Sequence, residues 1–430
     1  MTKPLIMLRL LRLFLLILSF GSVFAQPIRV RIEPADTGFR LRVNERPYYI
    51  NGFVGASQFA LAKACGANSV RTGASGKNLD EAQQNGLTAL TNLHIPGERD
   101  GMDWNDEGRK AALKEKLLAV VNELKDHPAV LIWVLGNELD WIPPGKPYNR
   151  KLWDFLNDVA RDIHRLDPHH PVMTVVGTSE LPQKFDELAR QCPDVDLLGI
   201  NAYADLGKAC AQARQHWKRP YVVTEWGPDG HWEVPKTAWK APLEQTSTEK
   251  AQSYRDRYQN VIQADREFCL GSYVFYWHHK QEITHTWYGM FDTEGNATEA
   301  VEAMSECWQG RLTPNRSPRL TSFYLIGQHD RRNILLKAGE AATANVAWQE
   351  PDGGPVTVAW EVRQEATYAA YAGQGEKEAQ TMGKQTLPKA ANSFSFMPPG
   401  QPGNYRLFVY LYDGKKHLTV ANLPFQVVKQ

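Results

Sequence analysis

Two glutamates stand at the ends of short apolar segments of the kind that form buried strands. Glu138 follows the apolar run 129–135 in the sequence Gly-Asn-Glu, and Glu225 lies in Thr-Glu-Trp-Gly at the end of the run 220–226. Two opposed carboxyl groups roughly 5 Å apart suit retaining glycoside hydrolysis, because one attacks the anomeric carbon and the other protonates the leaving oxygen. A lone glutamate after a strand is more often a solvated loop residue or a helix-cap partner. A pair at such positions favours the catalytic interpretation.

The acid of such a pair must hold its proton near neutral pH. Its surroundings therefore have to raise its pKa, and the negative charge of the second carboxylate is one means of doing so. Asp140, two residues beyond Glu138, is a further carboxylate that could serve as a loop ligand or a helix cap, and we assign it no role.

Eight strand–helix units are expected between about residues 48 and 310. The expected strands span 48–55, 67–73, 86–93, 129–135, 171–176, 195–200, 220–226 and 271–277, and the clearest helical patterns span 111–124 and 248–264, the second with N-cap residues at 247–249. Most of these strands are continuously apolar, as strands buried on both faces must be. Eight such units predict a closed (β/α)8 TIM barrel, whose active site forms at the carboxyl ends of the strands. An open doubly wound sheet is the alternative, but no glycine-rich nucleotide-binding motif follows any of the runs.

The pattern changes after residue 318. Strands are expected at 333–337, 342–349, 356–365, 393–397, 405–412 and 418–428, separated by turns rich in Pro, Gly and Asp, with a long loop at 366–391. Short strands at this spacing predict a C-terminal antiparallel β-sandwich, immunoglobulin-like in size. The predicted organisation is a signal peptide at 1–25, the barrel at 26–311 and the sandwich at 319–430.

The motifs at the ends of the fourth and seventh expected strands, 129–135 and 220–226, resemble the paired motifs of clan A glycoside hydrolases. The similarity is closest to the family 2 catalytic barrel, which includes β-galactosidases and β-glucuronidases, and it extends to Tyr-Ile-Asn-Gly-Phe at 49–53 and Gly-Ala-Asn-Ser-Val-Arg-Thr at 66–72. The resemblance covers roughly residues 48–310. Similar strand-end motifs also occur in β-glucan-active families of the clan, including transglycosylases.

The resemblance implies a role for individual residues. Glu138 would be the acid/base and Glu225 the nucleophile, while Asn137 would bind the sugar 2-hydroxyl. Arg71 would support the charge of the nucleophile, and Tyr203 would donate a hydrogen bond to it. Trp277 would form the floor of the subsite for the reacting sugar. The alternatives are a structural ion pair for Arg71 and core packing for the two aromatic residues.

Aromatic and polar side chains crowd the expected mouth of the barrel. Trp226 and Trp287 are candidate stacking surfaces for sugar rings, although about half of the tryptophans in this region are expected to pack loops instead. Gln281 and Glu282 follow the eighth expected strand, 271–277, and are candidate partners for sugar hydroxyls. No Cys or His spacing indicates a metal, so neither a metal nor a cofactor is expected.

The first 25 residues have the features of a secretory signal peptide. Basic residues precede an apolar run of eight, and small residues at 21–25 suit cleavage after Ala25, whereas the run is too short for a membrane anchor. A secreted or periplasmic protein is therefore expected. Five cysteines follow, and they are expected to be small buried apolar residues, with Cys269 and Cys307 as the candidate pair if one disulfide forms.

Charge and composition limit the partners. The chain has 49 Lys and Arg against 48 Asp and Glu, so no general electrostatic attraction to nucleic acid is expected. No later stretch is apolar for long enough to span a membrane. A carbohydrate substrate is expected, and the oligomeric state stays open. The leading hypothesis is a retaining β-glycosidase acting on a poly- or oligosaccharide, with β-glucan as the expected substrate. The alternatives are a transglycosylase using the same covalent intermediate and a non-catalytic carbohydrate-binding protein.

Overall fold

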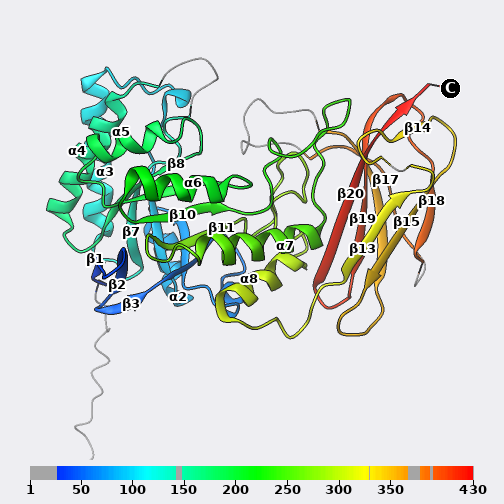
Figure 1. Cartoon of the computed structure of the whole chain (residues 1–430), viewed down its shortest axis with the longest axis horizontal. Helices are drawn as coiled ribbons and strands as arrows, with labels where there is room; N and C mark the ends of the chain where they lie inside the picture. The colour runs from blue at the N-terminus through cyan, green and yellow to red at the C-terminus, as the bar shows by residue number, and fades with distance from the viewer. Residues whose placement is uncertain (1–26, 142–147, 329, 367–377, 388–390, 430) are drawn as a thin grey trace, which may run out of the picture.

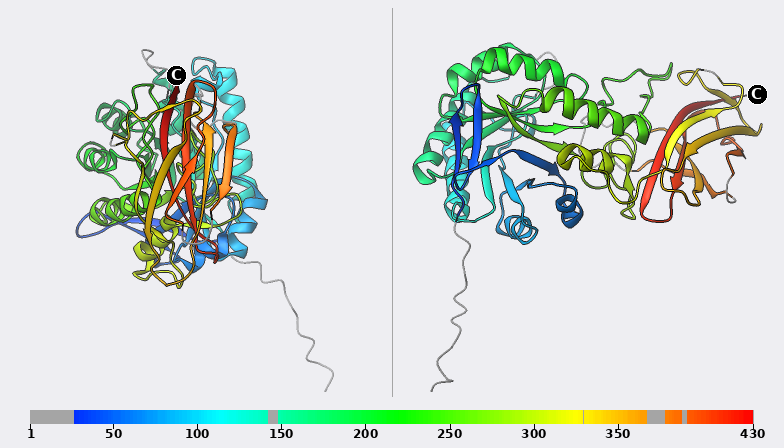
Figure 2. Two further views of the ribbon diagram at one scale, coloured as in Figure 1. Left: turned by 90° about the vertical axis from the view of Figure 1, so that its right-hand side faces the viewer. Right: turned by 60° about the horizontal axis from the view of Figure 1, so that its bottom comes forward.

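The chain forms a barrel and a C-terminal β-module that lie side by side in an elongated molecule (Figure 1). The structure is a computed structural model, which describes residues 27–141, 148–328, 330–366, 378–387 and 391–429. The predicted signal peptide lies outside the described residues. Helices α7 and α8 lie on the side of the barrel that faces the module, as the turned views also show (Figure 2).

Eight parallel strands close into a barrel in the order β10-β11-β4-β5-β6-β7-β8-β9. Their bounds are β4 (Ile50–Val54), β5 (Ser69–Gly73), β6 (Thr88–Leu93), β7 (Val130–Leu135), β8 (Val172–Val176), β9 (Leu197–Asn201), β10 (Tyr221–Trp226) and β11 (Cys269–Phe275). Every residue of β7, β8 and β9 is buried, because these strands face the barrel interior on one side and the helices on the other. The prediction of a TIM barrel is confirmed.

The helices surround the barrel and follow the apolar periodicity of the sequence. They are α1 (Phe59–Ala64), α2 (Gly76–Gln84), α3 (Glu107–Leu124), α4 (Lys151–Leu166), α5 (Gln183–Gln191), α6 (Leu206–Gln212), α7 (Ser247–Arg257) and α8 (Glu299–Gln309). The N-cap of α7 is Thr246, one residue earlier than expected, and it exchanges hydrogen bonds with Glu249 in a capping box. The helical pattern predicted to reach residue 264 ends in a π-helical turn at Tyr258–Ile262.

A small N-terminal sheet that was not among the strands expected from the sequence covers the amino ends of the barrel strands. It consists of β1 (Val30–Pro34), β2 (Phe39–Val43) and β3 (Arg46–Tyr48). Its buried side chains Val30 and Leu41 join the core inside the barrel. The backbone of β1 bonds to His169, just before β8, so the sheet closes the end of the barrel opposite the two glutamates.

The close contact between β11 and β4 depends on a glycine, and we expect its replacement to destabilise the barrel. Gly271 has φ +130°, and a Cβ there would lie 2.2 Å from the carbonyl oxygen of Ile50. Gly271→Ala is expected to lower the free energy of unfolding by about 3 kcal/mol or more. Urea unfolding followed by tryptophan fluorescence measures this. The control Gly76→Ala, at the open start of α2, should change it by less than about 1 kcal/mol. Equal effects would contradict the argument.

Two sheets pack face to face in the C-terminal module around a shared apolar core. Their strands are β13 (Arg319–Leu325), β14 (Leu335–Lys337), β15 (Ala342–Gln349), β16 (Thr357–Gln364), β17 (Thr381–Thr386), β18 (Ser393–Phe396), β19 (Gly403–Tyr412) and β20 (His417–Val428). Most pairings are antiparallel, but β14 and the two-residue strand β12 (Ala297–Thr298) run parallel to β20. The strands expected from the sequence did not include β13 or β17, and β17 lies where a long loop was expected. The immunoglobulin-like character and the exact domain limits stay predictions.

The candidate disulfide does not form. All five cysteines are free, and four of them are buried. Burial raises the pKa of the Cys269 thiol to about 12, so it acts as a small packing residue rather than a reactive one. Among the described residues, no helix has the length and apolar character needed to cross a lipid bilayer.

Candidate active site

The carboxyl ends of the barrel strands open into a cleft of about 770 Å³ that contains both glutamates. Its walls include the following charged, polar and aromatic residues: Arg99, Asp100, Asn137, Glu138, Trp141, Asn201, Tyr203, Asp205, Glu225, Trp232, Glu233, Phe275, Lys280 and Glu282. Glu138 comes from the end of β7 and Glu225 from the end of β10, so the structure brings the two residues together in one cleft as the strand positions predicted.

An unusual backbone turn places Glu138 in the cleft. Gly136 has φ +69° and Glu138 itself has φ +47°, a left-handed conformation that non-glycine residues rarely adopt. The turn is held by a hydrogen bond from the backbone NH of Glu138 to Val175, in β8. Gly177, just beyond β8, borders the Glu138 carboxyl group, and a Cβ there would be in van der Waals contact with it at 3.4 Å. Backbone strain of this kind concentrates at functional sites.

A hydrogen-bonded network of Asn201, Asn137 and Arg71 surrounds the acid, and Asn201 contacts it directly. Asn201, at the end of β9, donates from its amide nitrogen to Glu138 at 2.8 Å and to the Asn137 Oδ1 atom at 3.1 Å. Arg71, in β5, also donates to Asn137 Oδ1, at 2.6 Å. Because this oxygen already accepts two hydrogen bonds, the NH2 group is the end of Asn137 that can serve a ligand in the cleft.

Glu225 is an ion-paired carboxylate whose side chain is 17% exposed. Arg71 donates to its Oε1 atom at 2.8 Å and to the Thr224 carbonyl at 3.2 Å, and the arginine side chain is only 5% exposed. Tyr203 donates to the Oε2 atom at 3.4 Å. The guanidinium compensates the charge of Glu225 and fixes its orientation.

The environment of Glu138 raises its pKa to about 7. Burial is the larger cause and the negative charge of Glu225 is the second, while the hydrogen bond from Asn201 acts in the opposite direction. The sequence-based argument named only the second carboxylate. A carboxyl group with this pKa is mostly protonated below about pH 7 and can act as a general acid there.

Of the other predicted binding residues, Glu282 lies in the cleft wall and three tryptophans do not. Trp226 is fully buried and packs on Tyr254 of α7 and on Tyr258, because neighbouring residues of a strand point to opposite faces and Glu225 takes the inner one. Trp277 is fully buried against Phe53 and other core rings. Its predicted role as the floor of the sugar site is therefore corrected, and Phe275 lines the cleft instead.

Trp287 and Gln281 also lie away from the cleft. Trp287 is 1% exposed, and its indole NH bonds to the Asp229 carbonyl. Gln281 lines a small cavity against Arg363 of the C-terminal module. Both residues follow β11, which is the eighth strand of the barrel. The connection after β11 runs toward the module, so its side chains divide between the cleft and the interface.

Sequence reasoning missed Asn201 and the charged rim of the cleft. Asn201 lies one residue beyond the expected end of its strand, and its position two residues before Tyr203 was the available signal. Asp140, left without a role, forms a buried ion pair with Lys184. Trp232 is 51% exposed and contacts Tyr203 edge to face, so it is an available stacking surface. Within the described residues, no three Cys, His, Asp or Glu side chains cluster as metal ligands.

Comparison with known proteins finds a family match within the barrel. Residues 78–247 match the family model of glycosyl hydrolases family 2, TIM barrel domain. The matched segment contains Glu138, Asn201 and Glu225. The resemblance that the motifs indicated is thereby confirmed over this segment of the barrel.

The individual relatives are distant. Over 253 residues the chain is 24% identical to a β-glucuronidase of Streptococcus agalactiae, covering 47% of this chain and 41% of that protein. Over 76 residues it is 33% identical to a putative β-glucuronidase of Formosa agariphila, covering 17% of this chain and 9% of that protein. The chain thus spans less than half the length of the curated relatives it matches. A crystal structure of Parabacteroides merdae β-glucuronidase aligns over 93% of this chain and 53% of its own, with 15% identity and a TM-score of 0.47.

Proposed function

We propose that the protein is an exported retaining β-glycosidase that acts on a neutral β-linked poly- or oligosaccharide such as a β-glucan. One observation carries the proposal: a protonatable Glu138 and an ion-paired Glu225 line the same cleft at the carboxyl ends of the barrel strands. Export is supported by the signal-like sequence of residues 1–25.

The two carboxyl groups divide the chemistry of a double displacement. Glu225 attacks the anomeric carbon and Glu138 gives its proton to the leaving oxygen, so that a covalent glycosyl-enzyme forms. Glu138, now ionised, then takes a proton from water as the water attacks the same carbon and releases Glu225. Asn137 offers its NH2 group to the 2-hydroxyl of the reacting sugar. If a sugar hydroxyl replaces the water, the product is that of transglycosylation.

The charge of the cleft supports a neutral sugar. Besides the catalytic pair, four carboxylates line it: Asp100, Asp205, Glu233 and Glu282. The cationic residues of the wall, Arg99 and Lys280, already pair with carboxylates, at 3.7 Å to Asp100 and 3.3 Å to Glu282. A uronate would meet net repulsion from these groups. The β-glucuronidase names of the curated relatives make glucuronides the alternative that has to be tested.

A substrate panel tests this proposal. Aryl β-glucoside, β-galactoside, β-mannoside and β-glucuronide are compared, together with β-linked glucans, galactans and mannans. We expect kcat/KM for the best neutral substrate to exceed that for the glucuronide by about 100-fold, since juxtaposed like charges cost several kcal/mol. Proton NMR of the first product should show the β-anomer. A preference for the glucuronide would contradict the substrate assignment, and an initial α-anomer would exclude the retaining mechanism.

A further inference from the structure

A buried carboxylate connects the barrel to the C-terminal module. Glu244 lies between β10 and α7 and is 3% exposed. Its Oε1 atom accepts hydrogen bonds from Lys250 at 2.6 Å and Thr286 at 2.8 Å. Its Oε2 atom accepts from Thr284 at 2.7 Å and Asn422 at 2.8 Å. The four donors come from α7, from the β11–α8 connection and from strand β20 of the module.

On the barrel side, a single residue, Thr284, connects the Glu244 carboxylate to the wall of the cleft. Thr284 and Glu282 form a two-residue bridge through backbone hydrogen bonds of 2.7 and 3.1 Å. The Glu282 side chain lies in the cleft, 3.3 Å from Lys280 and 3.6 Å from His231. The Thr284 hydroxyl that bonds to Glu244 therefore fixes the backbone that carries Glu282.

On the module side, two buried polar residues complete the connection. Asn422 accepts a hydrogen bond from Arg406 of β19 at 2.7 Å. Arg406 also donates to the carbonyl of Pro242 in the barrel at 2.9 Å and pairs with Glu365 at 2.8 Å. The module thus supplies a guanidinium and an amide to the same short segment of the barrel that contains Glu244.

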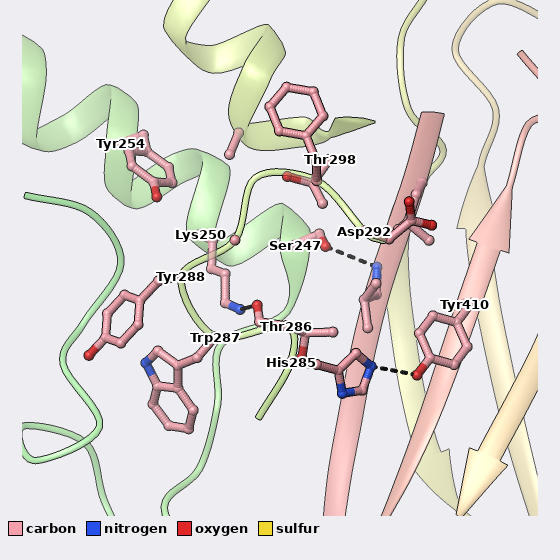
Figure 3. A pocket seen from close by; sticks show the side chains of 15 residues that line it. Ser247, Lys250, Tyr254, His285, Thr286, Trp287, Tyr288, Asp292, Thr298 and Tyr410 are labelled. Atoms are coloured by element: carbon pink, nitrogen blue, oxygen red, sulfur yellow. Dashed lines mark hydrogen bonds between the residues drawn. The ribbon is translucent and has the colours of Figure 1, made fainter. Parts of the chain in front are cut away.

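The neighbouring contacts support the same connection. Figure 3 shows His285 pointing to Tyr410 of β19, with 2.8 Å between the ring nitrogen and the phenol oxygen. It also shows Lys250 reaching the Thr286 carbonyl, at 2.6 Å, and Ser247 facing the module, where its hydroxyl accepts a hydrogen bond from the backbone of Val420. The β11–α8 connection is therefore held between α7 and the module.

The charges around Glu244 keep it ionised. Burial alone would raise its pKa, but the charges of Lys250 and Arg406, with the hydrogen bonds, bring the pKa below its usual value. A buried ionised carboxylate is sensitive to the loss of any partner, because the remaining groups cannot be solvated. Removing one donor should therefore displace the connection and not merely weaken a single contact.

We propose that Glu244, Thr284 and Asn422 form a positioning cluster through which the C-terminal module holds the Glu282 wall of the cleft and thereby sets the affinity for the glycan. The inference rests on the proposed function and deepens it. None of the three residues is a catalytic residue. In this arrangement the module is a structural part of the substrate site.

Substitutions of single cluster residues in the full-length protein test the cluster. Thr284→Val removes the hydroxyl donor and keeps the shape, whereas Thr284→Ser keeps the donor. We expect Thr284→Val and Asn422→Ala to raise KM about tenfold with kcat changed less than about threefold, since each change leaves a partner of the buried carboxylate without its hydrogen bond. Thr284→Ser should restore KM to within about twofold. The matched control Ser247→Ala removes another contact between barrel and module, at α7, and should leave KM unchanged.

A binding measurement separates this inference from the proposed activity. Tryptophan fluorescence titration with a β-linked oligosaccharide reports affinity in the Glu225→Gln background, and a thermal melt confirms that each variant is folded. The same tenfold loss of affinity for Thr284→Val is expected there. Unchanged affinity in folded Thr284→Val, or an equal loss in Ser247→Ala, would overturn the positioning cluster. If the wild type proves inactive but Thr284→Val still lowers the affinity, only the enzymatic assignment would be rejected.

Discussion

Replacing Glu225 by glutamine is expected to lower kcat for β-glycoside hydrolysis by about 10⁴-fold or more. The amide has nearly the same shape but cannot attack the anomeric carbon, so the covalent intermediate no longer forms. Arg71 loses its ionic partner, but its bonds to Thr224 and Asn137 remain. The variant should therefore stay folded. Release of nitrophenol from aryl β-glycosides measures the rate, and circular dichroism with a thermal melt measures folding.

A second cleft carboxylate provides the control for this prediction. Glu233 lines the same cleft and accepts hydrogen bonds from the backbone of Ala204 and Gly230, which a glutamine oxygen can still accept. Glu233→Gln should keep kcat within about tenfold of the wild type. If Glu225→Gln retained full activity, or if both variants lost activity equally, Glu225 would not be the nucleophile.

Replacing Glu138 by glutamine is expected to lower kcat/KM by about 10² to 10⁴-fold for substrates with poor leaving groups. The loss should be smaller for aryl glycosides with acidic phenols, because such leaving groups need little protonation. The pH profile gives an independent signature. Since the pKa of Glu138 is raised to about 7, the acid form predominates below that pH, and kcat/KM of the wild type should fall as the pH rises through it.

The same variant identifies the group that titrates. In Glu138→Gln, the decrease of kcat/KM above pH 7 should disappear, because glutamine carries no proton to lose. Rates measured from pH 5 to 9 with one activated and one unactivated substrate check both expectations. A decrease that persists in the variant would assign the titration to another residue, and equal losses on both substrates would argue against general acid catalysis by Glu138.

Strand position in the sequence correctly predicted which side chains reach the cleft for several residues near strand ends, but it misplaced some of their neighbours. Arg71, Asn137 and Tyr203 lie in or directly beneath the cleft, because side chains at the carboxyl ends of barrel strands converge there. Glu282 also lines the cleft, although it comes from the long connection after β11. Trp226 was misplaced because the two-residue alternation of a strand turns it toward α7. Alternation could have excluded it, whereas the long connections after the strands follow no such rule.

The N-terminal sheet and the positioning cluster differ in the signal that they leave in the sequence. Strands β1 and β2 lack the continuous apolar runs of the barrel, but apolar and charged residues alternate in them, and this period-two pattern was an available signal for half-buried strands. Glu244, Thr284 and Asn422 are separated by up to 178 positions and meet through the packing of the module on the barrel. No local pattern marks a polar residue that will be buried by a distant segment.

The sequence by itself determined the barrel, the order of its strands and the positions of the two glutamates at the strand ends. These features depend on local periodicity and on continuous burial, which are written directly in the order of apolar residues. The tertiary structure alone decided which aromatic residues face the cleft, how Asn201 joins Glu138, and how strongly burial raises the pKa of that glutamate. Those properties arise from distances between segments far apart in the chain, and electrostatic and packing energies depend on such distances.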